Sequence, residues 1–374
     1  MTPRFRTLDE AAAWYHGWLK DAALPLWAKA GVDSLGGFHE ALTPDGRPYE
    51  APRRARVQTR NVYVYASAST AGLEGDWLPI AVRAFDRFMA QYRRPDRLFV
   101  STVGAAGAVL DPTPALYEQD FALLAMAALR VADPSRTELV AEATATLAAL
   151  EALRHPAGGY REFGDHPFQA NAHMHLLEAV VAWEETGAAG WADLADEIVE
   201  LAMRRFIDPD EGFLREFFDA DWRPAPGDDG RLVEPGHQFE WAWLLERWSR
   251  KRGDPVASSA ARRLFAHGLR GVDAGRGVAI NALWDDFGLR DASARLWPQT
   301  EYLKAALILG EDAEALTAAN SLAGYLDTPA PGAWRDKLRP DGSFVEEPAP
   351  ASSFYHLMVA LLELLRAMDR LPAR

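Results

Sequence analysis

The stretch GGFHEALTPDGRP, which runs from Gly36 to Pro48, decides the fold because variants of it return along the chain. Several copies share a glycine, an aromatic residue, a polar residue and then Asp-Gly or a similar turn pair, a pattern typical of a short β-hairpin. The further copies are RLFVSTVGAAGAVLD from Arg97, GGYREFGDH from Gly158, EGFLREFFDADWRP from Glu211, GRGVAINALWDDFGL from Gly275 and GAWRDKLRPDGSFVE from Gly332. The chain therefore contains six repeats with a period of roughly 55–65 residues.

A helix with a polar first turn follows each phrase, and its apolar residues recur at helical spacing, as in FALLAMAALRVA. Six helix pairs with one apolar face each can bury those faces by stacking into a closed ring. We therefore predict an all-α (α/α)6 barrel, a toroid with short β-hairpins at one end; an open solenoid is the alternative. No linker divides the chain, so we expect residues 1–374 to form one domain. The inner helices are predicted to begin near Gln58, Tyr117, Asn171, Pro235, Trp297 and Ser353.

The composition is that of a globular protein. Of the 374 residues, 49% are hydrophobic and 25% are charged, and the formal net charge is −14. An acidic surface repels phosphate backbones and anionic lipids, so we expect neither a nucleic-acid nor a membrane partner. The sequence has no cysteine, no apolar stretch of membrane-spanning length and no signal peptide, and we expect a cytoplasmic protein.

The first turns of the six inner helices are expected to meet at one mouth of the ring, because a hairpin always precedes them. Such an arrangement forms a polar pocket at one end of an apolar barrel. The residues that these turns supply are Arg60, Tyr117, Glu118, Asp120, Asn171, His173, His175, His237, Glu240, Trp297, Gln299, Glu301 and His356.

Two histidines in this pocket are candidates for moving protons. His237 lies in EPGHQFEWAWLL, and Glu240 follows three residues later on the same helical face. A carboxylate there would orient the imidazole and raise its pKa. His356 lies in PASSFYHLMVALLEL, at a place in the repeat that matches His237. The alternatives are a surface His–Glu pair for His237 and a structural core histidine for His356.

The segment NAHMHLLEA contains two more histidines, which point about 200° apart on a helix and cannot bind one metal ion. Asn171, His175 and Glu178 share a stripe, so we expect His175 to face the cavity with Asn171 beside it. His173 is expected to turn aside. Zinc-protease and calcium-loop motifs are missing, and we expect neither a metal nor another cofactor.

Arg60, in RVQTRNVYVYASA, can hold a substrate oxygen and stabilise negative charge that develops on it. A structural salt bridge is the alternative for this residue. Trp297, Gln299 and Glu301, in LWPQTEYLKAA, can offer a stacking face and hydrogen bonds to a ligand, or they can pack within the ring.

These motifs resemble the N-acylglucosamine 2-epimerase superfamily, especially its members of the mannose isomerase and sulfoquinovose isomerase type. The likeness is carried by RVQTRNVYVYA, LYEQDFALLAMA, NAHMHLLEA, EPGHQFEWAWLL, RLWPQTEYLKA and SSFYHLMVALLE, in order from about residue 50 onwards. The resemblance implies an (α/α)6 barrel with catalytic histidines at His237 and His356. Asp120 stands where many members are expected to have a small residue. The positions that match the sugar site of the family are Arg60, Tyr117, Asn171, His175, Glu240 and Trp297.

The resemblance also implies an enzyme that interconverts a free aldose such as D-mannose with a ketose such as D-fructose. One histidine would remove the C2 proton to give an enediolate, since its pKa lies near neutral pH. A sugar 2-epimerase is the alternative. An inverting glycoside hydrolase with Glu240 and Glu301 as its carboxylates, and a non-catalytic sugar-binding protein, are further alternatives. The expected partner is a small sugar, bound by a monomer or homodimer.

Overall fold

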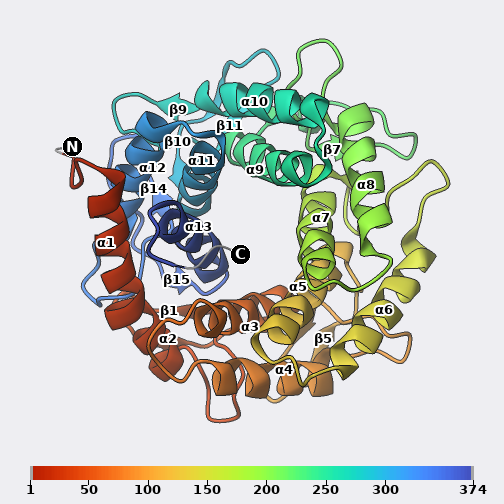
Figure 1. Cartoon of the computed structure of the whole chain (residues 1–374), viewed down its shortest axis with the longest axis vertical. Helices are drawn as coiled ribbons and strands as arrows, with labels where there is room; N and C mark the ends of the chain where they lie inside the picture. Colours follow the sequence, from red (N-terminus) through yellow and green to blue (C-terminus); the bar gives the residue numbers. More distant parts are fainter. Residues whose placement is uncertain (1–2, 372–374) are drawn as a thin grey trace.

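Two concentric rings of helices form a toroid in the computed structural model, which describes residues 3–371 (Figure 1). The inner ring consists of α3 (Ala55–Thr70), α5 (Leu116–Ala132), α7 (Ala170–Glu185), α9 (Pro235–Arg252), α11 (Leu296–Leu309) and α13 (Ser353–Ala367). The outer ring consists of α1 (Leu8–Trp18) and α2 (Leu24–Ala30), joined by a π-helical turn, and of α4 (Leu78–Tyr92), α6 (Glu138–Leu150), α8 (Trp191–Leu201), α10 (Pro255–Leu269) and α12 (Asp312–Tyr325). The barrel and the starts of its inner helices are as predicted, and the open solenoid is wrong.

Short strands lie at the end of the ring where the inner helices begin. The strands are β1 (Ala41–Leu42), β2 (Pro48–Tyr49), β3 (Arg53–Arg54), β4 (Thr102–Val103), β5 (Val109–Asp111), β6 (Phe168–Gln169), β7 (Phe217–Phe218), β8 (Leu232–Val233), β9 (Val272–Asp273), β10 (Val278–Ala279), β11 (Ala282–Trp284), β12 (Leu289–Asp291), β13 (Ala294–Arg295), β14 (Lys337–Leu338) and β15 (Ala349–Pro350). All their pairings are antiparallel, and β1–β2, β4–β5 and β11–β12 are hairpins within the repeated phrases.

The strand that leads into an inner helix pairs with the phrase of the next repeat. This gives the pairs β3–β4, β6–β7, β8–β11 and β13–β14, and β15–β1 joins the last repeat to the first. The joint at α5 differs, because Glu162 takes the place of a strand there and accepts from the backbone N–H groups of Leu116 and Tyr117. The phrase from Gly158 therefore makes a capping turn where the repeat pattern predicts a hairpin.

The N-terminal helices complete the ring by packing on the last repeat, and Figure 1 shows α1 alongside α12. Tyr15 donates its hydroxyl hydrogen to the carbonyl oxygen of Ala319, and Trp27 donates to that of Gly332. The Trp27 ring also stacks on Trp334 with the ring centres 4.5 Å apart. These contacts bury the aromatic N-terminal segment against residues that are distant in sequence.

A glutamine in the first turn of four inner helices holds the turn of its own phrase. Its side-chain amide accepts from the N–H and donates to the C=O of one residue, so both backbone groups are satisfied although they are buried. The pairs are Gln58 with Phe38, Gln119 with Phe99, Gln238 with Leu214 and Gln299 with Ala279. In the third repeat, His173 accepts from the Tyr160 N–H instead.

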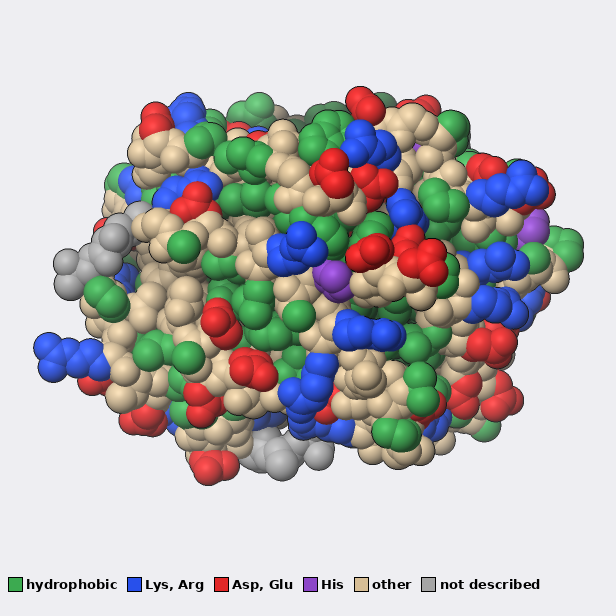
Figure 2. Space-filling view, turned by 90° about the horizontal axis from the view of Figure 1, so that it is seen from above, with side chains coloured by type: hydrophobic (Ala, Val, Ile, Leu, Met, Phe, Trp, Pro, Cys, Tyr) green, Lys and Arg blue, Asp and Glu red, His purple; other side chains and the backbone are tan. Residues whose placement is uncertain are grey.

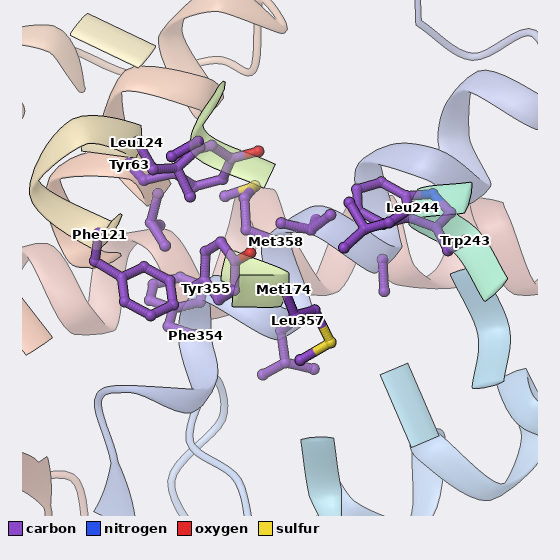
Figure 3. Packing of buried hydrophobic residues seen from close by; sticks show 14 of the residues in the cluster. Tyr63, Phe121, Leu124, Met174, Trp243, Leu244, Phe354, Tyr355, Leu357 and Met358 are labelled. Atoms are coloured by element: carbon purple, nitrogen blue, oxygen red, sulfur yellow. The ribbon is translucent and has the colours of Figure 1, made fainter. Parts of the chain in front are cut away.

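Apolar and aromatic side chains fill the space between the helices. Figure 3 shows Phe121 and Tyr355 next to each other, their ring centres 5.3 Å apart, with Trp243 on the opposite side. On the outer surface, acidic and basic side chains are interspersed (Figure 2). Among residues 3–371, no helix is both long and apolar enough to cross a membrane.

Candidate active site

A cavity of about 250 Å³ lies at the mouth where the inner helices begin. It contains eight of the nine residues named from the sequence as catalytic or substrate-binding, so the prediction that the first turns converge is confirmed. Its full lining is Arg60, Tyr117, Gln169, Asn171, His175, Glu216, Phe217, Glu234, His237, Glu240, Arg295, Trp297, Ser352, Ser353 and His356.

Gln299 is the residue that the structure does not bring to the cavity. Its side chain is fully buried and its amide is used up by the backbone of Ala279 and by the carbonyl oxygen of Arg295. The prediction of a substrate contact at Gln299 is therefore wrong. A residue two positions further on, Glu301, faces inward instead and contacts His356.

His237 is held by a carboxylate, but the carboxylate is not Glu240. Its Nδ1–H donates to Glu216 Oε2 at 2.7 Å, and Glu234 Oε2 lies 3.4 Å away. Burial alone would lower the pKa of His237, but Glu216 and Glu234 outweigh it and raise the pKa to about 10. His237 is therefore a cation at neutral pH, with Nε2–H as its second proton.

His356 differs from His237 in its charge, although it also donates from Nδ1 to a carboxylate. The acceptor is Glu301, at 2.9 Å. Burial lowers the pKa of His356 well below its ordinary value, and the cations Arg60 and Lys304 lower it further. His356 is therefore neutral. With the hydrogen on Nδ1, the lone pair is on Nε2.

The two histidines do not occupy matching places in the repeat. The Ala351 N–H bonds to the Glu40 carbonyl as the Ala55 N–H bonds to that of Ser101, so α13 is in register with α3 from these two residues onwards. His356 then matches Arg60 and lies one helical turn deeper than the position of His237. The sequence expectation of equal positions is wrong.

Trp297 lies between the two histidines, with its ring centre 5.0 Å from that of His237 and 5.9 Å from that of His356. Gly236 makes this placement possible, because a Cβ atom there would be 2.5 Å from the Trp297 ring. The aromatic face thus forms one wall of the cavity next to both imidazoles.

Arg60 reaches the cavity from α3. It donates to the Tyr117 hydroxyl at 2.7 Å, and its guanidinium lies 4.0 Å from the centre of the Phe121 ring. Its Nε has no partner among the described residues. No acid in the described part of the chain forms the salt bridge considered as the alternative, and the guanidinium keeps N–H groups for a ligand.

His175 faces the cavity as predicted, and Asn171 lies beside it on the lining. Burial lowers the pKa of His175 to about 4 against the opposing effect of Glu178, 3.6 Å from its Nδ1. His173 turns aside, as predicted, and its Nε2 receives the backbone N–H of Tyr160.

A layer of buried charge lies below the cavity. Neither oxygen of Glu240 has a hydrogen-bond partner within residues 3–371, and burial together with Glu301 raises its pKa to about 8. Lys304 Nζ lies 2.5 Å from Glu301 Oε2, and the Tyr355 hydroxyl donates to Glu178. Glu240 belongs to two groups whose ligand atoms lie within 4.8 Å of one another and could hold a metal by distance, but Lys304 already supplies a cation to this layer.

A family model described as N-acylglucosamine 2-epimerase (GlcNAc 2-epimerase) matches residues 36–360. The chain belongs to the N-acylglucosamine 2-epimerase family. The resemblance stated from the sequence motifs is thereby confirmed, and the protein is an enzyme of the isomerase and epimerase class.

Individual members of this family are similar over most of the chain. A protein of Rhizobium meliloti (strain 1021) named mannose-6-phosphate isomerase is 47% identical, covering 95% of this chain and 97% of its own length. A D-mannose isomerase of Thermobifida fusca is 29% identical over 82% of this chain and 81% of its own. The structure of cellobiose 2-epimerase from Spirochaeta thermophila DSM 6192 superposes with a TM-score of 0.86 at 24% identity, covering 97% of each chain.

The acidic partner of His237 was missed from the sequence, although the repeats of this family member contain a signal for it. Glu216 lies two residues after the residue that Gln238 holds, and the equivalent turn positions are polar throughout. They are Glu40, Ser101, Glu162, Glu216, Asn281 and Asp336. Comparing the phrases by this position would have placed Glu216 at the mouth.

Proposed function

We propose that this protein interconverts a free aldose such as D-mannose with its ketose, D-fructose, by proton transfer between C2 and C1. The observation that carries the proposal is the pair of histidines in one small cavity. Both have Nδ1 fixed on a glutamate, but His237 is charged and His356 is neutral. One is ready to donate a proton and the other to accept one, as enolisation next to a carbonyl requires.

The first step is opening of the sugar ring, in which we assign the proton transfer to His175. His356 then takes the proton from C2 of the open aldose while His237 donates a proton to O1, which gives an enediol. His237 next receives the O2–H proton, and His356 returns its proton to C1, so both histidines regain their starting states. The guanidinium of Arg60 stabilises negative charge on the sugar oxygens during these steps.

The size and charge of the cavity support an uncharged monosaccharide. A volume of about 250 Å³ is below the ~300–1,000 Å³ typical of ligand pockets, which suits one sugar ring better than two. The acids Glu216 and Glu234 line it together with the cations Arg60, Arg295 and His237, and the net charge of −14 on the whole chain repels a dianionic sugar phosphate. The D-mannose isomerase of Thermobifida fusca is named for such a substrate, whereas the Rhizobium meliloti relative is named for the phosphorylated sugar.

Epimerisation at C2 is the second candidate, because imidazoles on two helices could protonate C2 from opposite faces. The inverting hydrolase has less support, since Glu301 is bound to both His356 and Lys304 and is not free to activate water.

The test is incubation of the enzyme with D-mannose in deuterated water, with the products followed by NMR. We expect D-fructose with deuterium at C1, and much slower turnover of D-mannose 6-phosphate. Formation of glucose with deuterium at C2 would instead show that the enzyme is a 2-epimerase. His237→Gln and His356→Gln should each lower kcat by about 100-fold or more; turnover by both variants at the wild-type rate would overturn the proposal.

A further inference from the structure

Lys304 lies on α11 one turn below Glu301, outside the lining of the sugar cavity. The side chain is fully buried. Its Nζ is 2.5 Å from Glu301 Oε2 and 4.1 Å from the centre of the Trp243 ring. An ammonium group removed from water costs several kcal/mol unless it is well paired, so its retention calls for an explanation.

The ammonium remains charged because carboxylates surround it. Burial would lower the pKa of Lys304, but Glu301, Glu240 and Glu178 outweigh the burial and raise it. Lys304 is thus the cation of a layer that contains three buried acids.

The two oxygens of Glu301 have different partners. Oε1 accepts the Nδ1–H of His356 and, at 3.2 Å, the hydroxyl of Thr300, and Oε2 faces Lys304. A carboxyl group as deeply buried as Glu301 tends to take up a proton, and burial does raise its pKa while Lys304 lowers it. A protonated Glu301 could donate to Nδ1 of His356, which would leave the hydrogen of the neutral imidazole on Nε2.

We propose that Lys304 is the positioning residue that makes His356 the proton acceptor of the active site, by holding Glu301 in the anionic form that fixes the hydrogen of His356 on Nδ1. This inference rests on the proposed function for its chemical meaning, since a base at C2 needs the lone pair on Nε2. The tautomer itself is a property of the ligand-free protein.

The comparison with His237 supports this role. The groups that act most strongly on His237 are the carboxylates of Glu216, Glu234 and Glu240, and it is a cation. His356 is packed among groups of both signs. They are Glu301 and Lys304 on α11, Arg60 on α3, His175 and Glu178 on α7, and Glu240 on α9. The glutamate that holds the base, His356, is thus bound to the cation Lys304, and this cation distinguishes the site of His356 from that of the acid, His237.

The first experiment replaces the charge and keeps the length of the side chain. Lys304→Met should lower kcat about 100-fold at pH 7 and change KM less than about threefold, because Lys304 does not touch the sugar. The loss should diminish as the pH is raised, because Glu301 then loses its proton without the help of Lys304. Lys304→Arg keeps the cation and should retain most of the activity. Equal loss in both variants at every pH would overturn the proposal.

The second experiment is independent of the substrate. NMR of protein with ¹⁵N-labelled histidine, with the His356 signals assigned from His356→Gln, reports the tautomer and charge of this imidazole. The wild type and Lys304→Arg should show neutral His356 with hydrogen on Nδ1. Lys304→Met should show hydrogen on Nε2 or an imidazolium, and Lys304→Gln replaces it if that variant does not fold.

An unchanged His356 signal in the uncharged variant would overturn the inference, whatever sugar the enzyme uses. The expected change in the signal, combined with no turnover of any aldose by the wild type, would instead reject the proposed function and leave the role of Lys304 in place.

Discussion

The charge on His237 depends on Glu216, a side chain in the turn between α8 and α9. The pKa of His237 is about 10 in the folded protein and about 6.5 in an unfolded chain. A pKa that is raised on folding stabilises the protein fully below pH 6.5, and this contribution is lost as the pH rises through 10.

Glu216→Gln should therefore lower the free energy of unfolding by about 2 kcal/mol at pH 6 and by much less at pH 10. Urea denaturation of the variant and the wild type at both pH values measures the difference. Glu216→Asp is the control that keeps the charge. A difference that stays constant between pH 6 and pH 10 would contradict the link to His237.

Asp120 is a buried carboxyl group on α5 with no partner for either oxygen among the described residues. Burial raises its pKa well above the ordinary value, and Glu162 and Glu118 raise it further. Such a group destabilises the folded protein once the pH exceeds the unfolded pKa of about 3.9, and the penalty grows up to the folded pKa.

Asp120→Asn should accordingly stabilise the protein by about 1–3 kcal/mol at pH 7, and the gain should vanish below about pH 4. Thermal or urea unfolding across this pH range measures it. Since Asp120 does not line the cavity, kcat and KM should stay within about twofold of the wild type. Loss of activity in a stable variant would show that the carboxyl group reaches the substrate.

At the scale of the elements, the glutamine that ties four of the six phrases to their helices is structural. Gln299→Leu leaves the buried N–H and C=O of Ala279 without partners and should cost about 2–4 kcal/mol of stability with little change in KM. Gln119→Leu removes the same three hydrogen bonds at the matching place on α5 and should cost as much. A raised KM in the Gln299 variant alone would restore this residue to the sugar site.

The periodicity of the sequence predicted the inner helices because one apolar face per helix and a fixed hairpin-to-helix order leave few ways to pack. It also placed His175, His237 and His356 at one mouth, since each lies within the first two turns of an inner helix. Pairing between repeats is not visible in this pattern, because it depends on backbone groups. The contact of Glu162 with the start of α5 therefore escaped prediction. The contact of Glu216 with His237 lies within one repeat and joins a turn to the helix that follows it, which the spacing of residues within that helix does not show.

The spacing of residues within one helix also gave two wrong predictions, the carboxylate partner of His237 and the orientation of Gln299. His237 and Glu240 share a helical face, but the shortest contact of His237 comes from a turn 21 residues earlier in the chain. Gln299 and Glu301 are two residues apart and point to opposite sides of α11. Which of them faces the cavity depends on the rotation of the helix, which packing against α9 and α13 sets.

At the scale of the whole molecule, we predict that the ring unfolds as one unit, because its apolar core is continuous and its first and last repeats are joined. Trp27→Ala at the closure and Trp183→Ala, which removes the stack on Trp191 in the middle of the chain, should each cost about 3–5 kcal/mol. Both variants should retain one transition, at the same denaturant concentration by circular dichroism and by fluorescence. Two separate transitions in the Trp27 variant would show that the repeats unfold independently.

The contacts between the N-terminal helices and the last repeat also determine when the chain can finish folding during translation. Tyr15 and Ala319 are 304 residues apart in sequence, and the paired strands β1 and β15 are separated by an even longer stretch of sequence. At ~5–20 residues per second, a ribosome needs roughly 15–60 s to make that intervening length. During this interval the aromatic face around Trp27 lacks the residues that cover it in the folded ring, so we expect this segment to be prone to aggregation until the last repeat is made.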